Sequence, residues 1–318
     1  MFFPYKHNLI CKTKRKWDHA CPYFASFKGA KYLSLQRKAF TLVELLVVIA
    51  IIALLTAVVL PSLSGVRNRA AQFKELNALR STLTAWNQYA TDQKGALIPA
   101  FYGNPPLDVL PAFYEDGKPI PTDVYGSQRA VVCRWPWRLA PYLGHDFRAL
   151  TMQDGDDPVQ LASGNDLGKY LYFSSLYPSF GMNGMWVGGD QERYGFLPAE
   201  IKGQRNPFAN FYVSRLSTIR HTERLIVFAS SRTNQSAGAT DVCREGYFRV
   251  ESPNWIGPQW SAYDPDVAQS CGNVSARWQG AASVGTVNGA TELVPIEELR
   301  DMRRWADQAT DAKWHFSP

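Results

Sequence analysis

The residue types that most often do chemistry are sparse and scattered in this 318-residue sequence. The histidines after residue 40 are His145, His221 and His315, and no two of them have the spacing of a metal-binding pair. No phosphate-binding glycine loop, HExxH motif or GxSxG motif is present, although residues 281–285 resemble the last without its first glycine. The sequence therefore predicts a protein that is not an enzyme.

The densest acidic cluster holds Asp154, Asp156 and Asp157, with Asp166 close behind in the sequence. Carboxylate oxygens are the ligands that Ca²⁺ prefers, so these residues are a weak candidate calcium site. Their spacing is not that of an EF-hand loop, and a solvated acidic turn explains them more simply. We therefore expect no required cofactor, with calcium as the single candidate ion.

Three cysteines follow residue 40, at positions 133, 243 and 271. Cys243 and Cys271 are 28 residues apart, and in an oxidising compartment a disulfide between them could contribute about 3 kcal/mol. Three cysteines leave at least one thiol unpaired, and their spacing does not resemble a zinc site. The pair is a candidate disulfide, and buried free thiols are the alternative.

An apolar run extends from Phe40 to Leu60 and contains one charged residue, Glu44. As a helix these 21 residues would be about 31 Å long, which matches the roughly 30 Å hydrocarbon core of a bilayer. A carboxylate in such a helix costs on the order of 2–3 kcal/mol and usually has a specific partner. The alternative for Glu44 is a tolerated charge near the helix end.

The net charge of +6 comes from the segment before this run. Residues 1–39 hold nine of the 34 Lys and Arg and one of the 28 Asp and Glu, which leaves 25 basic and 27 acidic residues downstream. The basic segment favours a cytoplasmic N-terminus. The downstream part has no excess of positive charge, so no nucleic-acid partner is predicted.

The residues from Arg37 to Leu46 resemble the processing motif of type IV pilins and type II secretion pseudopilins. The resemblance implies cleavage by a prepilin peptidase between Ala39 and Phe40, followed by N-methylation of Phe40. Glu44 then becomes the fifth mature residue, where the family has Glu, and its carboxylate would pair with the α-amine of Phe40 in a neighbouring subunit. The expected partners are therefore the peptidase/methyltransferase, other pilin or pseudopilin subunits and the inner membrane.

Two features depart from that family pattern. The family usually has Gly before the cleavage site, where this chain has Ala39, so we expect cleavage to be retained but slower. A leader of 39 residues is also long, which is compatible with a start codon placed too far upstream. An alternative interpretation of this segment is an ordinary secretory signal peptide cleaved after Ser64. The charge of Glu44 and the length of the apolar run argue against this interpretation.

The helical pattern continues beyond the apolar run. Apolar residues recur at spacings near 3.5 and predict one helix over about 40–94, whose second half packs on a domain. The spaced set is Val66, Phe73, Leu76, Leu79, Leu83, Trp86 and Ala90. Pro61, often a proline position in the family, and Gly65 predict a kink.

Beyond residue 95, short apolar runs alternate with turn signals. Candidate strands are 130–133, 170–173 and 224–229, and Asn288-Gly289 predicts a two-residue hairpin turn between 283–287 and 290–294. A short helix is expected over 295–308, with Leu299, Met302 and Trp305 on one face. We predict an α+β fold in which the long helix packs on an antiparallel sheet, as in pilins. The expected organisation is a basic leader (1–39), a transmembrane and assembly helix (40–60), its amphipathic continuation (61–95) and a β-rich extracytoplasmic domain (96–318).

Two further features concern the domain's role. Residues 177–184 resemble an SYGMN-type stretch, and the predicted hairpin resembles the tail, of pilin-like bacterial proteins that occur as many paralogues. The tryptophans are expected to form core rather than a sugar- or protein-binding surface. They include Trp135, Trp137, Trp186, Trp255, Trp260 and Trp278.

These observations predict a structural subunit of a type IV pilus-like or type II pseudopilus filament. Its single span would leave the N-terminus in the cytoplasm and the C-terminal domain outside the inner membrane. The alternative is a membrane-tethered extracytoplasmic protein that binds or adheres through its aromatic domain. A pilus, a secretion system and a DNA-uptake apparatus all share this type of N-terminus, so the machine stays open.

Overall fold

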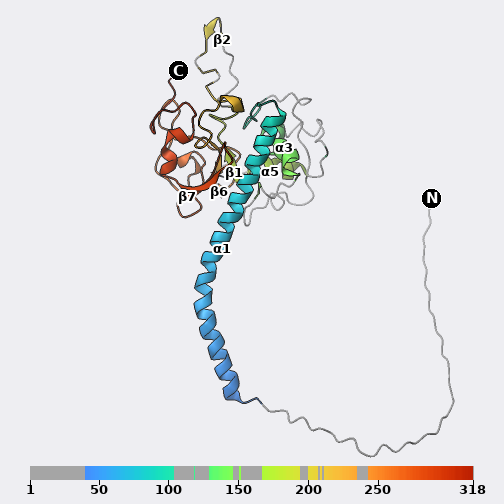
Figure 1. Cartoon of the computed structure of the whole chain (residues 1–318), viewed down its shortest axis with the longest axis vertical. Helices are drawn as coiled ribbons and strands as arrows, with labels where there is room; N and C mark the ends of the chain where they lie inside the picture. Colours follow the sequence, from blue (N-terminus) through green and yellow to red (C-terminus); the bar gives the residue numbers. More distant parts are fainter. Residues whose placement is uncertain are drawn as a thin grey trace, which may run out of the picture. The chain divides into compact units, whose positions relative to one another are not determined.

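The structure is a computed structural model of the 318-residue chain. It describes residues 40–103, 118, 129–145, 150–151, 167–193, 200–206, 208–209, 211–234 and 243–317. Side chains are described over the same ranges except at 58–64, 129, 167, 200, 201 and 205. The chain divides into two compact units, Met1–Leu60 and Pro61–Pro318, and each is described by itself (Figure 1).

The long helix predicted over 40–94 is present as α1 (Leu42–Asp92). In the second unit its buried residues include Leu79, Leu83, Trp86 and Ala90, which are all 0% exposed. The prediction that Val66 and Phe73 share this face is wrong, because they are 62% and 67% exposed. The domain therefore covers only the later turns of α1.

The central sheet has four antiparallel strands in the order β1-β4-β7-β8. Its strands are β1 (Phe180–Met182), β4 (Ile226–Ser230), β7 (Ala281–Thr286) and β8 (Thr291–Pro295). The strand predicted over 224–229 is confirmed as β4, whose five residues are all buried. A register shift between Ile226 and Phe228 marks a bulge beside β7.

Helix α1 packs on this sheet at Gly285 of β7. A Cβ atom at position 285 would lie 2.7 Å from Leu83 Cδ1 and 3.2 Å from Leu79 Cγ, so the two leucines lie against the strand backbone. Phe228 is the partner of Gly285 in the β4–β7 register, and its ring lies 4.8 Å from that of Trp135. The predicted α+β architecture, a helix packed on an antiparallel sheet, is confirmed for this unit (Figure 1).

The predicted C-terminal hairpin is present as β7 and β8, but its turn differs from the prediction. Gly289 donates to the Thr286 carbonyl at 2.9 Å, and Thr286 donates to Ala290 at 3.0 Å, which makes a three-residue loop. Gly289 has φ +87°, whereas Asn288 keeps a negative φ. The loop is thus a turn closed by a left-handed glycine rather than the expected two-residue turn. The Asn288 side chain stabilises it by accepting from Thr286 Oγ1 and Ala290 N.

Two predicted strands are helices. Residues 130–133 lie in α2 (Arg129–Cys133), and residues 170–173 lie in α5 (Leu167–Leu176). The strand predictions were wrong because a short apolar run is compatible with a buried helix as well as with a buried strand. Between α2 and α5 come α3 (Pro136–Leu139) and the 3₁₀ turn η2 (Ala140–Leu143).

The remaining elements are short. Two small antiparallel pairs are formed by β2 (Glu200–Ile201) with β3 (Gln204–Arg205), and by β5 (Arg232–Thr233) with β6 (Arg244–Glu245). Single 3₁₀ turns lie at η4 (Leu216–Thr218) and η5 (Ala268–Cys271).

The helix predicted over 295–308 is wrong in type. The segment forms two 3₁₀ turns, η6 (Glu298–Arg300) and η7 (Met302–Arg304), separated by Asp301 in extended conformation. The Asp301 side chain caps η7 by accepting from Arg303 N, which ends one turn and begins the next. The predicted burial of this face is confirmed: Leu299, Met302 and Trp305 are 0% exposed.

Tryptophans dominate the core of the second unit, as expected. Trp135 and Trp137 are fully buried and donate their indole N–H groups to the carbonyls of Phe248 and Leu171. Trp186 is 2% exposed and donates to Ser252 Oγ. Each of these three buried indoles therefore has a hydrogen-bond acceptor, which offsets the cost of burying its N–H group. Trp255 and Trp278 are half-buried, and Trp260 is 9% exposed.

Candidate functional site

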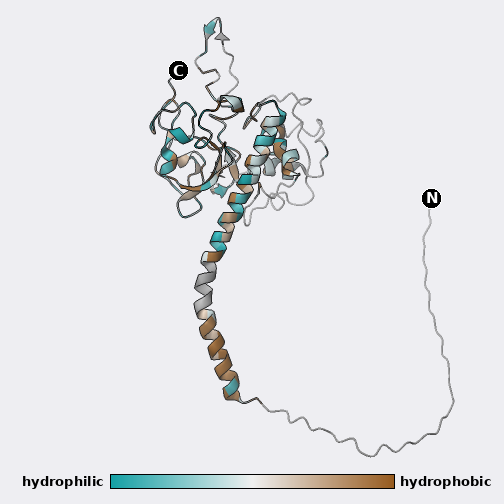
Figure 2. Cartoon of the chain, in the orientation of Figure 1, coloured by the Kyte–Doolittle hydropathy of each residue, from teal (hydrophilic) through white to brown (hydrophobic). Residues whose placement is uncertain are grey.

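The first described turns of α1 expose apolar side chains on every side. The large apolar residues from Phe40 to Leu55 are between 45% and 80% exposed. Figure 2 shows this part of α1 coloured mostly as hydrophobic. Glu44 is the one charged residue between Phe40 and Ala57. An apolar surface of this extent indicates a protein–protein or lipid contact.

Across the described residues, no helix contains an apolar stretch long enough to cross a membrane.

A capping box fixes the start of α1. Thr41 immediately precedes the helix, and Glu44 N donates to Thr41 Oγ1 at 3.2 Å. In return Glu44 Oε2 accepts from Thr41 N and Thr41 Oγ1, each at 2.9 Å. Two of the helix's unsatisfied N–H groups are thereby paired. The sequence analysis missed this role of Thr41, although a Thr three residues before a Glu at the start of an apolar run is its signature.

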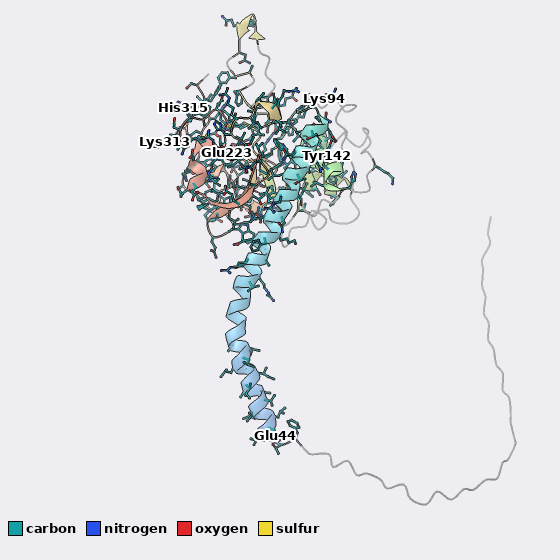
Figure 3. All side chains as sticks on the ribbon, viewed as in Figure 1. Glu44, Lys94, Tyr142, Glu223, Lys313 and His315 are labelled. Carbon is teal, nitrogen blue, oxygen red and sulfur yellow. The ribbon has the colours of Figure 1, made fainter. Side chains whose placement is uncertain are left out.

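The capping box leaves one carboxylate oxygen of Glu44 available. Oε2 takes both hydrogen bonds from Thr41, and no donor among the described residues reaches Oε1. An ionised carboxylate is an acceptor on both oxygens, so Glu44 can bind a further donor, and a protonated amine would also neutralise its charge. Glu44 lies at the N-terminal end of α1 (Figure 3). A negative charge at this end of a helix also interacts favourably with the helix dipole.

The other residues predicted near this end have mixed outcomes. Ala39 lies outside the described residues, whereas Phe40 is described and 76% exposed. Helix α1 continues through Pro61 and Gly65, and a Cβ at Gly65 would meet nothing within 4 Å. The kink at these two positions stays a prediction.

The structure contains no disulfide between Cys243 and Cys271, which are both free thiols. They lie on opposite sides of β5: Arg232 pairs with Glu245 of β6 on one side, and its N–H donates to the Asn273 carbonyl on the other. The candidate pairing therefore gains no support here and stays a prediction.

Metal and catalytic candidates gain no support. Asp154, Asp156 and Asp157 lie outside the described residues. Within the described ranges, no group of three or more His, Cys, Asp and Glu side chains could hold a metal ion. His221 is engaged with Asp307, whose carboxylate also accepts from the backbone N–H groups of Arg220 and His221.

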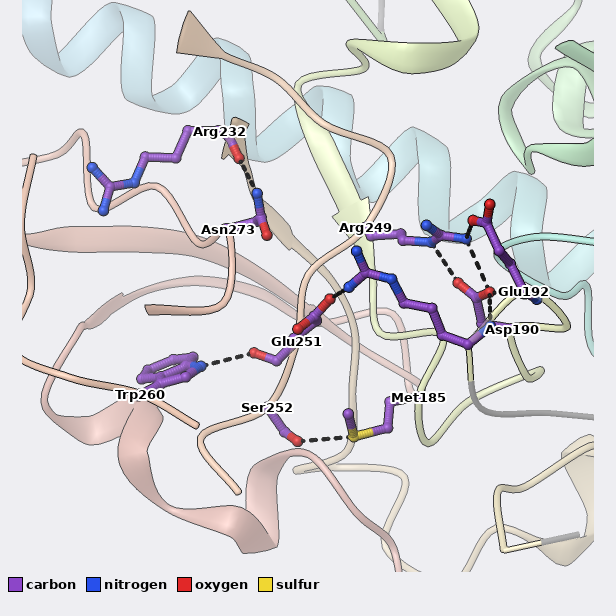
Figure 4. A network of polar contacts seen from close by, with 10 residues as sticks. Met185, Asp190, Glu192, Arg232, Arg249, Glu251, Ser252, Trp260 and Asn273 are labelled. Carbon is purple, nitrogen blue, oxygen red and sulfur yellow. Dashed lines mark hydrogen bonds and ion pairs between the residues drawn. The ribbon is translucent and has the colours of Figure 1, made fainter. Parts of the chain in front are cut away.

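A buried ionic cluster was not predicted from the sequence (Figure 4). Arg249 binds Asp190 through Nε at 2.5 Å and Nη2 at 3.0 Å, and its Nη2 also reaches Glu192. The guanidinium lies over the rings of Phe101 and Phe248. Through these contacts Arg249 joins the 190–192 turn to the core.

The SYGMN-like stretch is a junction inside the fold rather than an exposed site. Asn183 is fully buried, and its Nδ2 donates to the carbonyls of Ile226 and Trp305, each at 2.9 Å. Gly181 lies against Arg249, where a Cβ would come 2.6 Å from the backbone carbonyl. These residue types are required by close packing between β1, β4 and the C-terminal segment.

Comparisons with known proteins agree with this geometry. Residues 35–60 match the family model described as the prokaryotic N-terminal methylation motif. The type II secretion system core protein G of Aeromonas hydrophila is 32% identical over 102 residues, which are 29% of this chain and 70% of that protein. No solved structure matches. The chain belongs to the family of type IV pilins and type II secretion pseudopilins that carry the N-terminal methylation motif.

Proposed function

We propose that this protein is a filament subunit that is cleaved between Ala39 and Phe40, N-methylated at Phe40 and assembled through the first half of α1. The observation that carries the proposal is the start of α1, where exposed apolar side chains surround a single carboxylate. That carboxylate, Glu44, is held at the first turn by Thr41 and keeps one oxygen available.

The inner membrane is the proposed location before assembly. As a helix, the run from Phe40 to Leu60 would be about as long as the hydrocarbon core of a bilayer is thick. The basic segment before it favours a cytoplasmic N-terminus. The domain after residue 95 would then lie on the outer side of the membrane. A single apolar anchor also gives the exposed side chains of α1 a lipid environment before other subunits cover them.

Glu44 is the proposed contact that sets the register between subunits. Cleavage creates a protonated α-amine on Phe40, and an ammonium and a carboxylate that are each costly in lipid are tolerated together. Within one subunit Thr41 already uses Oε2 of Glu44, whereas Oε1 is available to a donor from another subunit. We assign that donor to the Phe40 amine of the neighbouring subunit.

Val66 and Phe73 extend the proposed subunit contact along α1. Both are exposed, at 62% and 67%, on the same helix that carries the exposed apolar residues of positions 40–55. They are seven residues apart, so they lie on one side of the helix.

The similarity to core protein G of a type II secretion system favours a secretion pseudopilus over a pilus.

The test compares Glu44→Ala and Glu44→Gln with Glu223→Ala in the full-length chain, expressed in its native host. Glu223 is an exposed carboxylate on the domain and serves as the matched control (Figure 3). We expect both Glu44 variants to insert in the membrane at normal levels but to lower the amount of sheared filament by about tenfold or more. Normal filaments from Glu44→Ala would overturn the proposal and favour a membrane-tethered binding protein.

A further inference from the structure

Arg232 of β5 is a buried cation with an unusual set of partners. The residue is 2% exposed and is one of the largest fully buried side chains of the domain. Its Nε donates to the Val274 carbonyl at 3.1 Å, Nη1 donates to the Pro265 carbonyl at 2.8 Å, and Nη2 donates to the Asp264 carbonyl at 2.7 Å. The guanidinium therefore lies inside a loop and binds its main chain from within.

The loop supplies two further oxygens and an aromatic ring to the same guanidinium. We define the 261–274 loop as the segment that contains η5. Nη2 of Arg232 also lies 3.2 Å from the Val267 carbonyl and 3.3 Å from Ser270 Oγ. The Tyr263 ring lies 4.3 Å from the guanidinium carbon. Five oxygens and one π face thus surround the cation.

None of these partners is a charged group. Among the described residues Arg232 makes no ion pair, and the oxygens around it are carbonyls and one hydroxyl. A buried arginine usually binds a carboxylate, because burying a charge without compensation is costly. Here the compensation comes from carbonyl dipoles that point inward, which is the arrangement that loops adopt around a bound metal ion.

The backbone of β5 secures the same loop. Arg232 N donates to the Asn273 carbonyl at 2.8 Å, and Asn273 Nδ2 donates back to the Arg232 carbonyl at 3.0 Å (Figure 4). Gly272 and Asn273 have φ values of +57° and +64°, so the chain turns sharply as it leaves η5. This turn directs the loop carbonyls toward one point.

We propose that Arg232 is the internal cation of the 261–274 loop. Its guanidinium occupies the oxygen-lined centre of the loop, so the chain itself supplies the charge that orders the loop. The ordered loop presents an exposed apolar side chain, Val267, at 44% exposure. The inference is independent of the filament assembly proposed above, since it concerns only the domain.

The proposal predicts that removing the charge releases the loop and leaves the rest of the domain folded. In Arg232→Met the apolar stem is kept, but the carbonyls of Asp264, Pro265 and Val274 lose their donors. Arg232→Lys keeps the charge with fewer donors and a different geometry, so it should have an intermediate effect. The matched control is Arg303→Met, which removes an exposed arginine bound to Asp301.

The experiment is limited proteolysis of the full-length chain in detergent with an Asp-specific endoprotease, with cleavage at Asp264 and Asp266 mapped by mass spectrometry. We expect cleavage in Arg232→Met to be faster by about tenfold or more, with a smaller increase in Arg232→Lys and none in Arg303→Met. Wild-type protein that is treated with a chelator, and then freed of the chelator by dialysis before the protease is added, should be cleaved at an unchanged rate. Wild-type resistance in Arg232→Met, or faster wild-type cleavage after chelation, would overturn the proposal. If Arg232→Met does not accumulate, the cleavage rate of Arg232→Lys is compared with that of Arg303→Met. Faster cleavage of Arg232→Lys supports the proposal, and equal rates overturn it.

Discussion

Leu83 of α1 lies against the backbone of Gly285 in β7, so closely that a Cβ at position 285 would come within 2.7 Å of Leu83 Cδ1. This contact fixes α1 to the sheet of the domain. Gly285→Val should overpack it and lower the free energy of unfolding by about 1–3 kcal/mol, and Leu83→Ala should leave a cavity that costs about 2–5 kcal/mol. Thermal unfolding of the full-length chain in detergent measures both.

Controls for this contact are available within the same chain. Gly65 lies on α1 with nothing within 4 Å of a Cβ, so Gly65→Ala should not destabilise the protein. The double variant Leu83→Ala with Gly285→Ala should be less destabilised than the sum of the two single changes, because the smaller residue makes room for the added methyl. Strict additivity would show that the two residues do not share this contact.

Thr41 is expected to matter for the start of α1. Thr41→Val removes the hydroxyl that accepts from Glu44 N and donates to Glu44 Oε2, whereas Thr41→Ser keeps it. Loss of such a cap costs about 0.5–2 kcal/mol, so the first turn should open more often in the valine variant. Amide hydrogen exchange of residues 42–45 should be faster in Thr41→Val and near wild type in Thr41→Ser. Equal exchange in all three proteins would contradict the capping role.

Asn183 joins β4 to the C-terminal segment through one amide group. Asn183→Ala leaves the carbonyls of Ile226 and Trp305 without a donor in the core, which should cost about 2–4 kcal/mol. Asn183→Asp should cost at least as much, because it places an oxygen against both carbonyls. Asn288→Ala, in the exposed hairpin turn, should cost less than either. Urea unfolding gives the order, and a core variant as stable as Asn288→Ala would contradict this account.

Tyr142 should make stability depend on alkaline pH. Burial and a hydrogen bond to the Asp92 carboxylate raise the pKa of Tyr142 to about 12, against about 10 in an unfolded chain. Between these values the unfolded state has lost a proton that the folded state keeps, so stability falls as pH rises from about 10 to about 12. The melting temperature of Tyr142→Phe should fall less over this range. Parallel curves for the two proteins would exclude the contribution.

The sequence could predict the elements with a strong local pattern. The helix followed from its apolar spacing, and the hairpin from Asn288-Gly289 between two apolar runs. The capping box at Thr41 was also predictable, since its two residues are three positions apart. In each case the residues that determine the structure are close in the sequence.

Features that depend on distant residues could not be predicted in this way. Arg249 and Asp190 are 59 positions apart, and Arg232 meets its loop carbonyls more than 30 positions later. The run at 130–133 became a helix because a short apolar stretch takes whichever form its neighbours bury best. The separation of Cys243 and Cys271 by β5 likewise appears only once the strands are paired.

Intact and peptide mass spectrometry of the protein purified from its native membrane shows directly where the mature chain begins and whether its α-amine is modified. We predict a chain that begins at Phe40 with one added methyl group on its α-amine. A chain that begins at Gly65, or one that keeps the segment before Phe40, would contradict prepilin processing and with it the proposed pairing of Glu44.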